Sequence, residues 1–67
     1  MTNGPDLQER VDVAVGALVA ELGPVHPSRF ASSLSYIAQR ASIEVGVRVV
    51  VSWSPYGVVG YPLPNGP

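Results

Sequence analysis

The chain has 67 residues, which is enough for one small domain and excludes a second. Hydrophobic residues make up 46% of it and charged residues 13%, with a formal net charge of −1. This composition is too apolar for intrinsic disorder, yet no stretch approaches the roughly 18 consecutive apolar residues that a membrane span needs. The weakly acidic balance also argues against nucleic acid as a partner, because phosphate binding requires several lysines or arginines and the chain has four.

The chain contains no cysteine and a single histidine, so neither a disulfide nor a metal site is expected to stabilise it. A domain of this size buries too little surface to be more than marginally stable without such help. We therefore predict that self-association or another protein completes the fold. Asp6 and Glu9 precede the apolar stretch, which is unlike a secretory signal, so the predicted location is cytoplasmic, or the virion if the chain is phage-encoded.

A first helix is predicted over residues 5–22. Pro5 suits the first turn of a helix, and Gly23 followed by Pro24 supplies a C-terminal glycine and a stop. Between these limits apolar residues recur at spacings of three and four, the period of an amphipathic helix. They are Leu7, Val11, Ala14, Val15, Leu18 and Leu22.

A second amphipathic helix is predicted to begin at Pro27 or Ser28. Its apolar stripe consists of Phe30, Leu34, Ile37, Ala38 and Ala41. The sequence leaves its end open, because residues 42–45 can continue the helix and Gly46 is the last plausible breaker.

Residues 47–53 form the only uninterrupted β-branched run and predict a strand. The alternation of side chains puts Val47, Val49, Val51 and Trp53 on one apolar face. Ser54–Gly57 fits a type I turn, with proline second and glycine fourth, so residues 58–61 are predicted to return as a partner strand. Pro62 ends that strand because it lacks the amide donor that a ladder needs.

The predicted fold is therefore α+β, with two helices followed by a C-terminal β-hairpin in the order ααββ. It comprises one domain over residues 1–61 and an extended, proline-rich tail over residues 62–67. Because an isolated hairpin is marginal in water, we expect the helices or another chain to cover its apolar face.

The hairpin carries the residues that we predict to bind a partner. Tryptophan and tyrosine at a hairpin tip provide a large contact area at little entropic cost, and an apolar edge strand invites pairing with another chain. Trp53 can equally close the core end of the valine face, whereas Tyr56 is the better contact candidate. The predicted partner-binding residues are Trp53, Pro55, Tyr56, Tyr61, Val49 and Val51.

Residues 33–46 resemble the first two-thirds of a helix-turn-helix motif. In this resemblance Ala38 is the small residue between the helices, Ala41 packs below it, and Ser42 and Ile43 occupy the turn. The resemblance implies a small DNA-binding regulator, which is our alternative function. The recognition helix would fall on residues 45–51, which are strand-like and nearly without donors for base edges.

Catalytic groups are sparse. His26 lies in a loop with no nucleophile or carboxylate beside it in sequence, and three of the five carboxylates follow the start of the first helix, where they match its dipole. We find no phosphate-binding loop, metal-ligand spacing or nucleophile motif, and expect no cofactor. The sequence thus predicts a non-catalytic structural or interaction subunit that oligomerises or packs into a larger assembly, of which a small phage virion component is one example.

Overall fold

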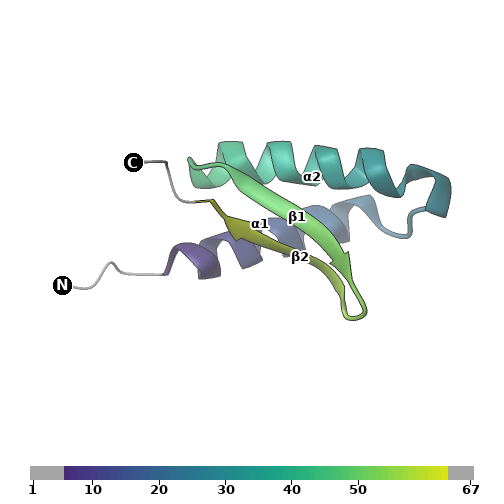
Figure 1. Ribbon diagram of the computed structural model, residues 1–67, viewed down its shortest axis with the longest axis horizontal. Helices are drawn as coiled ribbons and strands as arrows, with labels where there is room; N and C mark the ends of the chain where they lie inside the picture. Colours follow the sequence, from purple (N-terminus) through teal and green to yellow (C-terminus); the bar gives the residue numbers. More distant parts are fainter. Residues whose placement is uncertain (1–5, 64–67) are drawn as a thin grey trace.

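The computed structural model describes residues 6–63. Two helices lie side by side and the hairpin crosses one face of the pair, so the molecule has two layers (Figure 1). This arrangement confirms the predicted α+β fold. In chain order the elements are α1 (Leu7–Leu22), the 3-10 turn η1 (Pro27–Arg29), α2 (Phe30–Val45), β1 (Val49–Ser54) and β2 (Gly57–Pro62).

Helix α1 follows the predicted apolar period. It begins at Leu7 after the N-cap residue Asp6, whose carbonyl accepts the Arg10 amide at 3.1 Å. It ends at Gly23, which has a positive φ of 69° and donates its amide to the Val19 carbonyl. Pro5, predicted as the first helical residue, lies outside the described residues.

Helix α2 resolves the end that the sequence left open. It continues without interruption to Val45. Gly46 then ends the helix in the left-handed conformation, and its amide donates a hydrogen bond of 2.8 Å to the Ser42 carbonyl. Ser42 and Ile43 therefore lie inside a helix, where the helix-turn-helix resemblance required a turn. The next element is strand β1, so no recognition helix follows α2 within residues 6–63.

The hairpin has the predicted turn and a later start. Ser54 pairs with Gly57 across a loop of Pro55 and Tyr56, and the register extends to the pair Val49 and Pro62. Strand β1 begins at Val49 because the two residues before it connect α2 to the sheet. Strand β2 includes Pro62, one residue beyond the predicted domain limit, and the last four residues of the predicted tail lie outside the described part of the chain.

The core lies between the two layers. Its side chains come from one face of each helix and from the start of β1. Gly60 allows β2 to approach α1 closely, since a Cβ atom there would lie 2.9 Å from Val15 Cγ2. The buried residues are Val11, Ala14, Val15, Leu18, Ile37, Ala41, Val45 and Val49.

Candidate functional site

The two faces of the hairpin differ in what covers them. The predicted apolar face of β1 turns toward the helices, with Val49 buried and Val51 packed against the core. The opposite face, which we call the outer face, carries Val50, Ser52 and Ser54 from β1 and Val59 and Tyr61 from β2. Val59 is 39% exposed and Tyr61 46% exposed. Three of the five outer-face side chains, Val50, Val59 and Tyr61, are thus largely apolar and at least partly open to solvent.

The hairpin tip is held by its own serine. Ser54 Oγ donates to the Gly57 carbonyl at 2.9 Å and accepts the Tyr56 amide at 3.1 Å. This bonding fixes the backbone of the turn, while the Tyr56 side chain is 97% exposed and Pro55 is exposed beside it. The tip therefore presents a large exposed aromatic side chain on a braced backbone, and partner binding by Tyr56 and Pro55 stays a prediction.

Trp53 contacts the core and is also partly exposed; whether it binds a partner stays a prediction. Its ring lies 4.5 Å from that of Phe30, centroid to centroid, at an interplanar angle of 52°. It also lines an apolar hollow of about 150 Å³ between the ends of the helices and the hairpin, together with Val58 and Leu34. The side chain nevertheless remains 46% exposed. Trp53 therefore closes one end of the core and leaves part of its ring available to a partner.

Val49 and Val51 lie in a different environment from the aromatic candidates. Val49 is 3% exposed and belongs to the core, and Val51 is half-buried against it. Their side chains face the helices, so only their backbone is placed to meet another chain. Partner binding by these two residues stays a prediction, and it now concerns the edge of the strand.

Two polar side chains form hydrogen bonds at the sheet edges that the sequence analysis did not predict. Ser42 Oγ accepts the Val49 amide at 2.8 Å at the edge of β1. Gln8 Nε2 donates to the Gly60 carbonyl at 2.8 Å at the edge of β2. Both bonds link residues of different elements, so no local sequence pattern could have revealed them.

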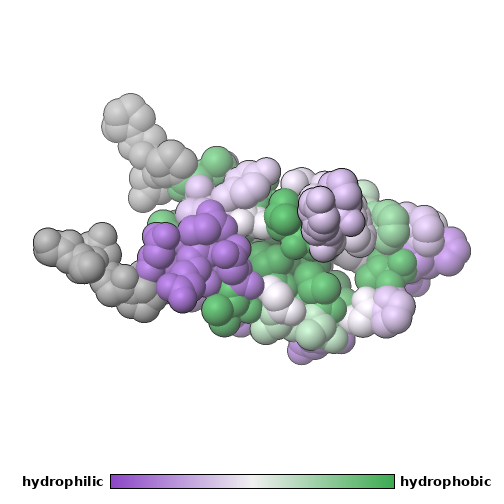
Figure 2. Space-filling model, turned by 90° about the horizontal axis from the view of Figure 1, so that it is seen from below, coloured by the Kyte–Doolittle hydropathy of each residue, from purple (hydrophilic) through white to green (hydrophobic). Residues whose placement is uncertain are grey.

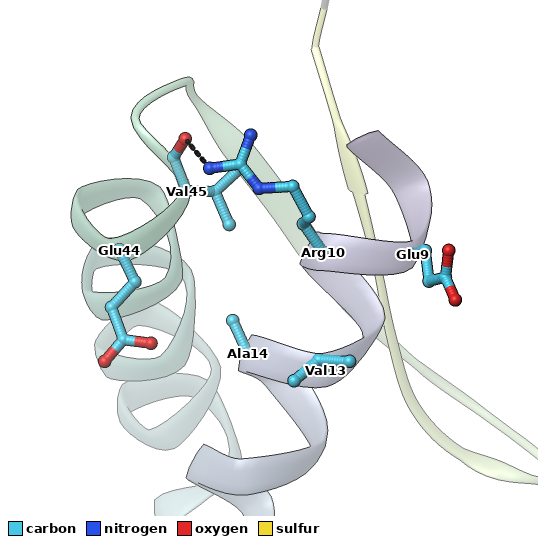
Figure 3. A pocket seen from close by; sticks show the side chains of 6 residues that line it. All are labelled: Glu9, Arg10, Val13, Ala14, Glu44 and Val45. Atoms are coloured by element: carbon cyan, nitrogen blue, oxygen red, sulfur yellow. Dashed lines mark hydrogen bonds between the residues drawn. The ribbon is translucent and has the colours of Figure 1, made fainter. Parts of the chain in front are cut away.

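An open cleft lies between the helices, lined by residues of α1 and α2 (Figure 3). It encloses about 340 Å³ and is open to solvent. Arg10 reaches across it, and its Nη2 donates to the Val45 carbonyl at the end of α2 at 3.2 Å. Glu9 and Glu44 come from different helices, and their carboxylates lie well apart, with that of Glu9 turned away from α2 (Figure 3). The arginine therefore has a structural bond, and the carboxylates form no acid–base pair.

His26 also has a structural contact. Its Nδ1 accepts the Ser28 amide at 3.1 Å and lies 2.9 Å from Ser28 Oγ, so the imidazole caps the turn η1. Among residues 6–63, no group of three or more histidine, aspartate or glutamate side chains is placed to hold a metal ion. The described helices include none with the length and apolar character of a membrane span.

The four arginines occupy separate parts of the fold. Arg10 is in α1, Arg29 in η1, Arg40 in α2 and Arg48 immediately before β1. From below, hydrophilic side chains gather at the end of the molecule where α1 begins, and hydrophobic side chains occupy the middle (Figure 2). The chain matches no family model, no curated protein and no solved structure.

Proposed function

We propose that the protein is a non-catalytic interaction subunit that assembles with other protein chains through its hairpin. One observation carries the proposal: the outer face is apolar where a solvated face is expected. An antiparallel sheet with one face in water usually alternates apolar side chains inward and polar side chains outward. Here Val50, Val59 and Tyr61 lie outward beside the two small polar residues Ser52 and Ser54.

The exposed aromatic residues support the same function. Contiguous exposed apolar surface in a small protein is typical of an interaction site, and tyrosine and tryptophan are frequent anchors of such sites. Tyr56 at the tip and Tyr61 on the outer face extend the apolar surface along the length of the hairpin. A partner that covers them also compensates for the small core of the chain.

No observation favours the alternative of a DNA-binding regulator. A helix-turn-helix protein reads bases with a second helix, and here the corresponding residues connect to a strand. Arg10 is hydrogen-bonded to the end of α2, and the other three arginines lie on different elements, so no basic helix face supports phosphate binding.

The solution mass tests the proposal. We would measure it by light scattering during size-exclusion chromatography, over a concentration series, for the wild type and for a double variant, Val59→Thr with Tyr61→Thr. Threonine keeps strand propensity while removing apolar surface. We expect the wild type to form an oligomer and the variant to have a lower mass at equal concentration, with an unchanged circular dichroism spectrum.

A wild type that remains a 7.0 kDa monomer at every concentration would contradict self-assembly. An oligomer whose mass is the same in the double variant would show that the outer face is not the contact surface. The matched control is Ser35→Thr, at an exposed position of α2 outside the hairpin, which should leave the mass unchanged.

A further inference from the structure

One hydrogen bond shows which backbone amide and carbonyl groups point toward the partner strand and which point to the free edges of the sheet. In an antiparallel pair, residues alternately direct their amide and carbonyl groups toward the partner strand and away from it. The Leu63 amide donates to the Arg48 carbonyl at 2.9 Å, which continues the ladder beyond the strand ends. Arg48, Val50 and Ser52 therefore face β2. The groups of Val49, Val51 and Trp53 point away, to the free edge of β1.

The free edge of β2 is partly closed. By the same alternation its outward residues are Val58, Gly60 and Pro62. The Gly60 carbonyl accepts a bond from the Gln8 side chain at 2.8 Å, and Pro62 has no amide to donate. An occupied acceptor and a missing donor leave this edge poorly suited to a further strand.

The free edge of β1 is closed at one end only. The Val49 amide is bonded to Ser42 Oγ at 2.8 Å. Within residues 6–63, the outward amide and carbonyl groups of Val51 and Trp53 have no hydrogen-bond partner. The strand also contains no charged residue and no proline, the usual protections of an exposed edge.

We propose that two copies of the chain pair through the free edges of β1, antiparallel and centred on Ser52. In this register Val51 of each copy lies opposite Trp53 of the other, and each such pair exchanges two hydrogen bonds. These two residues are the ones whose outward groups lack a partner. The proposal rests on the proposed function, and it names the partner and the contact.

A second copy fits this edge because an antiparallel pair of identical strands has two-fold symmetry, so one short segment serves both subunits. The opposed side chains are also compatible. Val51 meets Trp53 on the inner face and Ser52 meets Ser52 on the outer face, so no like charges meet across the axis.

Disulfide formation tests this register, because the chain has no cysteine of its own. Opposed residues at a non-hydrogen-bonded position of an antiparallel pair have Cα atoms about 4.5 Å apart, within the range of a disulfide. We expect Ser52→Cys to form a covalent dimer under mild oxidation. Val50→Cys, on the same strand and face, places the two cysteines at least about 13 Å apart in this register, beyond the reach of a disulfide.

The Ser52→Cys dimer should form at least roughly tenfold faster than the Val50→Cys dimer at equal concentration. If the wild type is oligomeric but the two variants cross-link equally or not at all, the pairing is wrong while the proposed function stands. If the wild type is monomeric throughout, the pairing and self-assembly fail together, and a strand of another protein becomes the occupant of this edge.

Backbone methylation provides a second test that changes no side chain. A chain of 67 residues can be assembled by chemical ligation with N-methyl-Trp53, which removes one proposed intermolecular donor. N-methyl-Val58 is the matched control, because Val58 lies directly opposite Trp53 and its amide points to the other edge. We expect the first change to raise the dimer dissociation constant at least about tenfold and the second to leave it unchanged. Equal effects would overturn the proposal.

Discussion

The two faces of the hairpin are similar in composition and opposite in environment. The inner face carries Val49, which is 3% exposed, and the outer face carries Val59 and Tyr61, which are 39% and 46% exposed. Both faces are rich in valine, so hydrophobicity does not distinguish them. The difference is that two helices can cover only one side of a two-stranded sheet.

This comparison is the basis for our proposal that the chain assembles with other chains. A buried face stabilises the monomer by removing apolar surface from water, whereas an equally apolar exposed face contributes nothing until a partner covers it. The outer face therefore has an energetic role only in an assembly. Substitutions on the inner face should change folding, and those on the outer face and tip should change association.

The largest expected effect is at Val49. We expect Val49→Lys to unfold the monomer, because a charged side chain in the core without a partner costs more than about 3 kcal/mol. Val50→Lys, one residue along on the outer face, should lower the free energy of unfolding by less than about 1 kcal/mol. Urea denaturation followed by circular dichroism measures both. A folded Val49→Lys variant with wild-type stability would show that the inner face is not buried.

A smaller effect is expected at Gly60. Its Cβ would lie 2.9 Å from Val15 Cγ2 and 3.1 Å from Val51 Cγ1, so Gly60→Ala should destabilise the fold by about 1–3 kcal/mol. Gly16→Ala is the control, since nothing lies within 4 Å of a Cβ at that exposed helical position. It should stabilise α1 by about 0.5–1 kcal/mol. Thermal unfolding measures both changes. If the two variants shift the melting temperature in the same direction, the close packing of β2 on α1 is contradicted.

Ser42 should have a moderate effect because it links α2 to the edge of β1. Ser42→Ala removes the acceptor of the Val49 amide and should cost about 0.5–1 kcal/mol, after the better helix propensity of alanine is included. Ser35→Ala, at an exposed position of the same helix, should be neutral or slightly stabilising. Amide hydrogen exchange at Val49 should accelerate in the first variant only, and unchanged protection there would exclude the bond.

The sequence predicted the elements well because their limits depend on local chemistry. The signals that set these limits act within a few residues along the chain. They are the helix-ending glycines Gly23 and Gly46, the turn at Pro55 and the alternation of valines in the strand. The exposed position of Tyr56 followed from the same turn. The links Ser42–Val49 and Gln8–Gly60 could not be predicted, since they join residues that only the packed layers bring together. The core contact of Trp53 could not be settled from the sequence for the same reason, because its contact with Phe30 is tertiary.

The smallest effect on folding is expected at Tyr56, and it separates the two kinds of surface most cleanly. The side chain is 97% exposed and the turn is held by Ser54, so Tyr56→Ala should change the free energy of unfolding by less than about 0.5 kcal/mol. If the tip contacts a partner, the same change should lower the mass observed by light scattering at a given concentration. The conservative variant Tyr56→Phe keeps most of the contact area and should retain the wild-type mass. A Tyr56→Ala variant that loses stability but keeps its mass would show that the tip stabilises the monomer and does not contact a partner. The outer face and the β1 edge would then remain as the candidate contact surfaces of the hairpin.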